Sequence, residues 1–209
     1  MSDSSSVSYH PAPPDPLLIV ISGPSGVGKD SVIEEMKNRR LPFHFVVTAT
    51  TRPPRPDEEH GVDYFFVSTD RFEEMIENEE LIEHAVVYED YKGVPKSQVR
   101  EGLKSGKHVV LRVDVQGAET IRNMVEGALL IFITTRNEEE LIQRLKKRNT
   151  ESEESLQLRI DTARQELQQI EIFDYVIENR EGKLERAVDV IEAIIVAEQH
   201  RVHQRKVEL

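Results

Sequence analysis

The sequence predicts an α/β fold in which a parallel sheet is interrupted by an inserted, strand-rich segment. Three observations lead to this prediction. Short, continuous apolar runs rich in β-branched residues recur along the chain, as buried parallel strands require. Stretches with helical spacing separate most of these runs, and such alternation is typical of βαβ units. Residues 50–93 break the alternation, because strands outnumber helices there.

The first part of the chain predicts a tail followed by a strand, a helix and a second strand. Residues 1–16 are rich in Ser and then in Pro without any apolar period, so we expect a disordered tail. The apolar run 17–22 predicts a buried strand that leads into a glycine-rich turn. Helical spacing over 30–40 predicts a helix, and 43–49 has the composition of a strand.

The remaining elements follow from the same two patterns. Residues 50–61 predict a loop, since prolines, glycines and charges crowd there. Strands are expected at 63–67, 81–88, 108–115, 129–134 and 174–178. Helices are expected at 69–78, 94–105, 118–125, 153–170 and 184–203, and Asn137 is expected to cap a helix that reaches residue 147.

Composition excludes several classes of protein. The 209 residues carry 27 basic and 39 acidic side chains, so a protein that coats nucleic acid is not expected. The chain has no cysteine, which excludes disulfide scaffolds, Cys-ligated zinc and thiol nucleophiles. The apolar runs are too short to span a bilayer, so no membrane partner is expected either. Any phosphate site must therefore be local, on an acidic background.

One motif predicts such a site, between the first strand and the first helix. It reads Gly23-Pro24-Ser25-Gly26-Val27-Gly28-Lys29 and has the phosphate-binding spacing G-x-x-x-x-G-K. Its glycines let backbone N–H groups turn towards a phosphate, the helix N-terminus adds a positive dipole, and Lys29 adds a cation. The next residues are Asp30 and Ser31, where such motifs usually place a hydroxyl that ligates Mg²⁺. Asp30 could bind the metal itself through a carboxylate oxygen.

Several later motifs resemble the guanylate kinase family of P-loop nucleoside monophosphate kinases. The first is Thr50-Thr51-Arg52-Pro53-Pro54-Arg55 with Glu58, Gly61 and Asp63-Tyr64, similar to the family's segment that binds the monophosphate. The second is Leu81-Ile82-Glu83-His84-Ala85, similar to its guanine-reading strand. The third is Leu111-Arg112-Val113-Asp114-Val115-Gln116-Gly117. The resemblance runs from about Leu17 to about Glu198, and some details resemble plant organellar and bacterial members.

The resemblance implies a fold, a reaction and a division of the chain. The fold is a P-loop NTPase parallel-sheet core with an inserted mixed α+β GMP-binding subdomain and a helical lid. The core takes residues 17–49, 99–135 and 160–209, the subdomain takes 50–98, and the lid takes 136–159. The reaction transfers the γ-phosphoryl group of ATP to GMP, or to dGMP, with Mg²⁺ accompanying ATP. The partners are then ATP and GMP, and the protein is a monomer or a small homo-oligomer.

The resemblance also assigns site residues. Catalysis is assigned to Lys29 and to the lid arginines Arg144, Arg148 and Arg159. ATP is assigned to residues 23–31, with Asp30 as the metal candidate, and to Asn179. GMP is assigned to Thr48, Arg52, Arg55, Glu58, Tyr64, Glu83, Lys92, Asp114, Gln116 and Gly117.

The residue chemistry agrees with the GMP assignment. A phosphate monoester carries about two negative charges, and two arginines on a proline-stiffened loop can grip it through forked hydrogen bonds. A carboxylate at Glu83 matches the ring N–H and amine of guanine, whereas adenine offers an acceptor where guanine has the ring donor. The alternatives at these positions are a solvated basic patch for Arg52 and Arg55, and an edge-strand salt bridge for Glu83.

The sequence departs from the family pattern at a few positions. Arg112 stands where the family usually has an acidic residue, and Asp30 stands where it has a hydroxyl. Because the two changes leave the local charge unchanged, we expect a buried or half-buried ion pair between them; the alternatives are that Asp30 binds Mg²⁺ directly or that Arg112 points to solvent. Lys92 and Val94 replace a phosphate-contacting Tyr and a base-contacting hydroxyl, which puts one guanine contact in question. Asp57 replaces a glycine.

Two other functions remain open at this stage. A catalytically silent interaction module would share the fold, but such modules typically lose the phosphate loop or its lysine. A P-loop kinase for another acceptor, such as AMP, would share the core, but Glu83 and Asp114 argue against it. The expected location is the cytoplasm, or a plastid or mitochondrion if a transit peptide has been trimmed.

Overall fold

The computed structural model describes residues 14–87, 90–147 and 153–209, and most of the expected tail lies outside these ranges. It contains a parallel core sheet in the order β2-β7-β1-β8-β9. The strands are β1 (Leu18–Ser22), β2 (Phe43–Phe45), β7 (His108–Arg112), β8 (Leu129–Thr134) and β9 (Tyr175–Glu178). The expected α/β fold with a parallel sheet is therefore confirmed.

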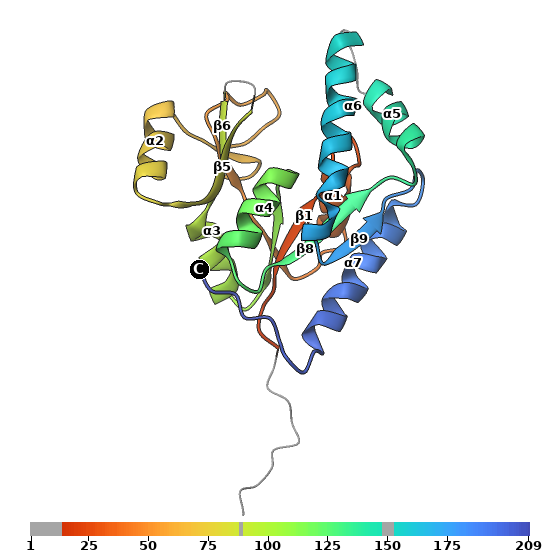
Figure 1. Cartoon of the computed structure of the whole chain (residues 1–209). Helices are drawn as coiled ribbons and strands as arrows, with labels where there is room; N and C mark the ends of the chain where they lie inside the picture. The colour runs from red at the N-terminus through yellow and green to blue at the C-terminus, as the bar shows by residue number, and fades with distance from the viewer. Residues whose placement is uncertain (1–13, 88–89, 148–152) are drawn as a thin grey trace, which may run out of the picture.

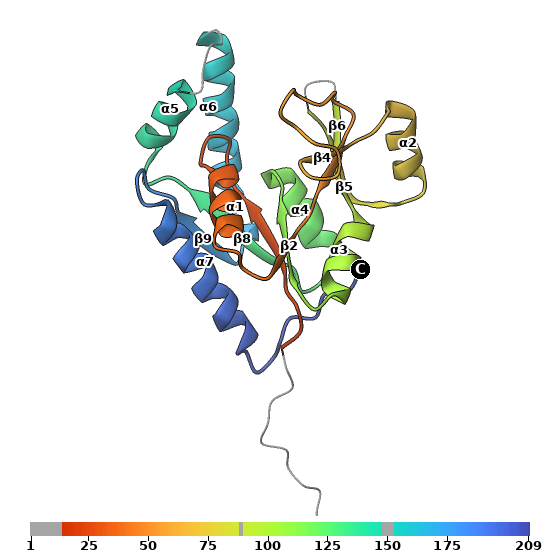
Figure 2. The same cartoon turned by 180° about the vertical axis from the view of Figure 1, so that it is seen from behind.

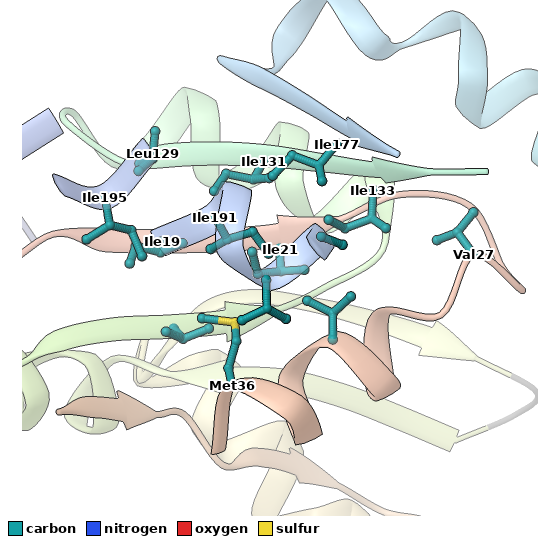
Figure 3. Packing of buried hydrophobic residues seen from close by; sticks show 14 of the residues in the cluster. Ile19, Ile21, Val27, Met36, Leu129, Ile131, Ile133, Ile177, Ile191 and Ile195 are labelled. Carbon is teal, nitrogen blue, oxygen red and sulfur yellow. The ribbon is translucent and has the colours of Figure 1, made fainter. Parts of the chain in front are cut away.

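Helices cover both faces of the core sheet because alternate strand residues point to opposite sides. They are α1 (Lys29–Asn38), α3 (Lys96–Lys104), α4 (Val115–Met124) and α7 (Leu184–Gln199). On one face, Ile19 and Ile21 pack with Met36 of α1 and Ile191 of α7, as Figure 3 shows. The other face packs against α3 and α4. Strand β1 is therefore buried on both faces, and the phosphate-binding motif begins at its carboxyl end.

A second, mixed sheet lies beyond the core and has the order β4-β3-β6-β5. Its strands are β3 (Thr48–Thr50), β4 (Tyr64–Phe66), β5 (Leu81–Val87) and β6 (Asp90–Pro95), and α2 (Thr69–Glu77) packs on it. Figures 1 and 2 show this unit and the helices α5 (Glu138–Lys147) and α6 (Glu153–Gln168) rising as two arms from the core. The interruption of the alternating pattern is therefore a separate sheet.

Two sequence predictions about this sheet were wrong. The single strand expected at 43–49 is divided, because β2 pairs with the core strand β7 whereas β3 pairs with β4 and β6. The second sheet thus begins at Thr48, slightly before the expected boundary at residue 50. Strand β6 was not predicted, and its last residues were assigned to the following helix. Its Gly93 and Pro95 give it little strand propensity, so its pairing with β5 decides its structure.

Helix ends differ from the predictions by a few residues. Helix α4 begins at Val115, because the Asp114 side chain accepts a hydrogen bond from the Gly117 N–H and caps it. The cap at Asn137 is confirmed, since its Oδ1 accepts from the Glu140 N–H at 3.0 Å. Helix α6 ends at Gln168 and a 3₁₀ turn follows at Ile170–Ile172. Within the described ranges, no helix is long and apolar enough to cross a membrane.

Helix α7 was expected to reach residue 203 but ends at Gln199, and residues 200–209 form a C-terminal strap under the core. Arg205 fixes the strap, because its Nε donates to the Glu198 carboxylate at 2.6 Å and its Nη1 donates to the Ala128 carbonyl at 3.1 Å. Glu198 is only 3% exposed, and its hydrogen bonds with Arg205 and Tyr175 outweigh burial and lower its pKa to about 2. Gly127 adjoins the strap, and a Cβ there would lie 2.1 Å from the Lys206 carbonyl oxygen.

Candidate active site

The phosphate-binding motif forms a tight loop between β1 and α1, and its glycines are required by geometry. Gly23, Gly26 and Gly28 all have positive φ angles, of 137°, 88° and 92°. A Cβ on Gly23 would lie 2.1 Å from the Ile133 carbonyl oxygen. The loop therefore lies directly on the carboxyl end of the core sheet, at the N-terminus of α1, where a phosphate is favoured.

Lys29 is the first residue of α1 and folds over this loop. Its Nζ donates to the carbonyl oxygens of Gly23 at 2.5 Å and Pro24 at 3.0 Å. The ammonium group thus lies beside the backbone that would surround a phosphate. Its expected role as a cation at the transferring phosphates stays a prediction.

The helices of the second arm hold the far side of the loop. Arg144 of α5 donates through Nη1 to the Val27 carbonyl at 3.0 Å and through Nη2 to the Asn179 carbonyl at 2.7 Å. The buried Asn179 side chain donates to the same Val27 oxygen at 2.8 Å. The Glu140 carboxylate Oε1 accepts from Arg144 Nη2 at 2.5 Å and so holds the guanidinium in this position. Arg144, assigned to catalysis by resemblance, and Asn179, assigned to ATP, both bond the loop backbone at the Val27 carbonyl.

Glu166 of α6 is a candidate that the sequence did not indicate. Burial raises the pKa of its carboxyl, while Lys29 and the Ser25 N–H, both in the loop, lower it. Its Oε2 is buried without a hydrogen-bond partner among the described residues. Position 166 lies in a polar helix, and no sequence signal distinguished this glutamate from its charged neighbours. It brings a carboxylate oxygen to the phosphate loop.

A second cationic segment, the arginine loop (residues 51–63), connects β3 and β4. Glu58 organises it, because its Oε1 accepts from Arg52 at 2.8 Å and its Oε2 accepts from the Arg55 N–H at 2.8 Å. These bonds lower the pKa of Glu58. The Arg52 guanidinium also lies 5.5 Å from the centre of the Tyr64 ring. Glu58 therefore positions the arginines and is not itself suited to bind an anion.

Lys92 of β6 brings a third cation to the same place. Burial lowers the pKa of its ammonium group, and the nearby Arg52 and Arg55 lower it further. Like charges repel, so a bound anion would be favoured beside these three cations, in addition to the nearby carboxylates of Glu58 and Asp90. The solvated basic patch that was the alternative for Arg52 and Arg55 does not explain a half-buried lysine near both of them. This cluster of cations has the chemistry of a phosphate site.

Glu83 of β5 lies at the other end of the second sheet, against the first turn of α4. Burial raises the pKa of its carboxyl to about 7, and the nearby Asp114 contributes to that rise. A Cβ on Gly117 would lie 3.0 Å from Glu83 Oε2, so only glycine leaves the carboxylate this position. No ion pair joins Glu83 to a lysine or arginine in the described part of the chain, which argues against the salt-bridge alternative.

The ion pair expected between Asp30 and Arg112 is present. It is more open than expected, since the side chains of Arg112 and Asp30 are 36% and 58% exposed. Arg112 Nη2 also donates to the Tyr64 hydroxyl at 3.2 Å. Burial lowers the pKa of the guanidinium, which stays protonated near neutrality because the ordinary pKa of arginine is far higher. Asp30 is therefore engaged by Arg112, and the alternative of a direct metal ligand loses support.

The other assigned residues have less specific surroundings. Ser31 is exposed on α1, and Thr48 lines a pocket of about 340 Å³ together with Asp30, Tyr64 and Arg112. Gln116 is exposed on α4, and Arg159 is half-buried on α6. Val94 is fully buried in the core, so it takes no part in a site. Arg148 lies outside the described residues.

Comparison with known proteins identifies the family. The family model for guanylate kinase matches residues 16–198. The chain belongs to the guanylate kinase family. It is 50% identical over 94% of its length to "Guanylate kinase 2, chloroplastic/mitochondrial" of Oryza sativa subsp. japonica, covering 70% of that protein.

Bacterial members of the guanylate kinase family are similar as well. The guanylate kinase of Halalkalibacterium halodurans is 43% identical over 92% of this chain and 93% of its own length. Among solved structures, the guanylate kinase from Anaplasma phagocytophilum superposes with a TM-score of 0.70 at 30% identity, covering 90% of this chain and 88% of that chain. The expected resemblance to plant organellar and bacterial members is thus confirmed.

Proposed function

We propose that the chain transfers the γ-phosphoryl group of ATP to GMP, and more weakly to dGMP, giving ADP and GDP. The observation that carries the proposal is the second sheet, which combines two kinds of site. Arg52, Arg55 and Lys92 gather there as a site for a phosphate monoester. Glu83 and Asp114 gather as a pair of carboxylates suited to the donors of guanine. One small ligand, GMP, carries both groups.

The phosphate loop would bind ATP on the opposite side. Its N–H groups and the dipole of α1 would hold the phosphates, and Lys29 would neutralise charge on the group in transfer. Arg144 and Asn179 would fix the loop from behind by holding the Val27 carbonyl. Arg159 would add charge from α6 when the nucleotide is bound, and closure of α5 and α6 over it would exclude water; the catalytic role assigned to Arg148 falls on a residue outside the described ranges.

Magnesium would enter with ATP. Mg²⁺ keeps several waters and is usually bound through phosphates and one or two carboxylates. The described residues contain no cluster of three acidic or histidine side chains that could hold a metal, which fits an ion carried mainly by the nucleotide. The unpartnered Glu166 Oε2 beside the loop is the protein oxygen best placed to join its shell. The ion would supply positive charge to the phosphate oxygens.

The transfer would need no general base from the protein. An oxygen of the GMP phosphate is already ionised near neutral pH and acts as the nucleophile. Catalysis then depends on in-line positioning and on charge stabilisation. The two phosphate sites supply both, since Lys29 lies on one side and the cations of the arginine loop lie on the other.

A coupled assay for ADP formation with MgATP and GMP, with GDP identified as the second product, tests the proposal. We expect turnover that requires GMP. A chain that binds GMP without turnover would be a silent interaction module, and the retained Gly23, Gly28 and Lys29 argue against that outcome. The name of the rice relative supports a plastid or mitochondrial location for this chain, and the cytoplasm is the alternative.

A further inference from the structure

Arg112 joins the two phosphate-binding halves of the molecule. It is the last residue of β7 in the core sheet, and its guanidinium contacts Asp30, which follows Lys29 in α1. The same guanidinium donates from Nη2 to the hydroxyl of Tyr64, the first residue of β4 in the second sheet. Tyr64 in turn stacks under Arg52. A continuous set of contacts therefore runs from the phosphate loop to the arginine loop.

The chemistry of a guanidinium determines what the Tyr64 hydroxyl can do. Arginine has only donors, so the hydroxyl must accept from Arg112. A phenol has one proton to donate, and accepting from Arg112 leaves that proton for another partner. Because Tyr64 lies beside Arg52, that partner can be an anion held by the arginine loop. A cationic donor also polarises the phenol and strengthens the hydrogen bond that it makes.

We propose that Arg112 is a positioning residue for GMP, which orients the Tyr64 hydroxyl to donate to the phosphate of the acceptor nucleotide. Asp30 holds the guanidinium in place from the first turn of α1. The phosphate loop and the monophosphate site are thereby tied at a fixed spacing, which in-line transfer requires. The inference rests on the proposed function in taking GMP as the ligand of the second sheet.

The two contacts of Arg112 should differ in how much they contribute to GMP binding. The Asp30 carboxylate is more than half exposed, so its ion pair contributes little, and Asp30→Asn should raise the KM for GMP only about two- to threefold. The hydrogen bond from a charged donor to the half-buried Tyr64 is stronger, so Arg112→Gln should raise that KM about tenfold. The KM for ATP should change much less than the KM for GMP after Arg112→Gln, since the Tyr64 hydroxyl that Arg112 contacts belongs to the second sheet and not to the phosphate loop.

A double-mutant cycle on the KM for GMP tests whether Arg112 acts through Tyr64. Tyr64→Phe removes only the hydroxyl, and adding Arg112→Gln to it should then cost less than about twofold more. If the KM for GMP in the double variant rises by the product of the two single-variant factors, the proposal is overturned. So would equal losses for ATP and GMP after Arg112→Gln. Arg112→Lys keeps the charge and a donor and should recover part of the affinity. If Arg112→Gln fails to fold, Arg112→Met, which keeps the length and removes the donors, replaces it in the cycle.

Arg122→Gln serves as the matched control. Arg122 is a partly buried arginine on α4 that bonds Asp174 at 2.8 Å and the Ile172 carbonyl at 3.0 Å, away from both phosphate sites. Its replacement should lower the thermal unfolding midpoint without changing the KM for GMP. Titration calorimetry with GMP separates this inference from the proposed function. A wild-type chain that does not bind GMP removes the function, whereas unaltered GMP binding in Arg112→Gln removes only the inference.

Discussion

Replacing Glu83 by Gln should remove a pH dependence from GMP use. Burial and Asp114 raise the pKa of Glu83 to about 7, so near neutrality about half of the chains carry a neutral carboxyl there. Only the ionised form can accept from both guanine donors. The ionised fraction rises about tenfold between about pH 6 and about pH 8, and the affinity for GMP should rise by the same factor. Glutamine keeps the shape of Glu83 and does not titrate.

The assay is the apparent affinity for GMP measured across this range by calorimetry, in wild type and in Glu83→Gln. The GMP phosphate also titrates, with a second pKa of about 6, but it does so equally in both proteins. The ratio of the two affinities therefore isolates Glu83. Parallel pH profiles for the two proteins would refute the assignment of this carboxylate to guanine.

Glu83→Gln, which should weaken GMP binding at alkaline pH, should also stabilise the fold there. A carboxyl whose folded pKa lies above its unfolded value binds more protons in the folded state, so its contribution to stability is lost as pH rises from about 4.5 to about 7. A shift of this size is worth about 3 kcal/mol above pH 7. Glu83→Gln should therefore unfold at a higher temperature than wild type at about pH 8, and show little difference below about pH 4. Lower stability at alkaline pH would mean that the buried carboxylate has a stabilising partner.

Three further predictions concern the phosphate loop, the arginine loop and the strap. Lys29→Ala should lower kcat by about 10²- to 10³-fold with little change in the unfolding midpoint, because its ammonium group lies at the phosphate loop, where it donates to the carbonyls of Gly23 and Pro24, and not in the apolar core; a variant with near-wild-type turnover would contradict the phosphate-loop mechanism. Arg52→Ala should raise the KM for GMP far more than the KM for ATP in the coupled assay, and equal changes would place Arg52 outside the monophosphate site. Gly127→Ala should cost about 1–3 kcal/mol or more of unfolding free energy, since its φ is 79° and a Cβ would collide with the Lys206 carbonyl. Gly106→Ala is the control, with a similar φ of 74° and nothing within 4 Å; equal losses in denaturant unfolding would show that the strap contributes nothing.

The fold was largely predictable from the sequence because the core strands are continuous apolar runs. Every strand of the core sheet was expected, and the error at residues 43–49 came from a run that crosses from one sheet to the other. The run stays strand-like in composition on both sides of the point where it leaves the core sheet, so the sequence gives no sign of the division. Strand β6 was missed for a related reason, since pairing with β5 rather than local propensity determines it.

The candidate site was predictable where a motif fixes the backbone and not where tertiary contacts do. Glycine spacing located the phosphate loop, and the ion pair between Asp30 and Arg112 followed from charge balance. Glu166 was missed because a glutamate in a polar helix has no sequence signal for burial. The cap that Asp114 forms on α4 was missed because the helix was expected to begin later. The contact of Arg112 with Tyr64 joins two sheets, so sequence spacing could not reveal it.

Comparing GMP, IMP and AMP as acceptors tests the central claim most directly, namely that Glu83 reads a guanine base. IMP keeps the ring N–H and lacks the amine, whereas AMP places an acceptor opposite the carboxylate. We predict that kcat/KM falls from GMP to IMP to AMP, with AMP about 10⁴-fold below GMP, because an unpaired buried carboxylate is costly. Glu83→Gln should reduce the differences in kcat/KM among the three acceptors. AMP turnover as fast as that of GMP in the wild-type protein would contradict the account.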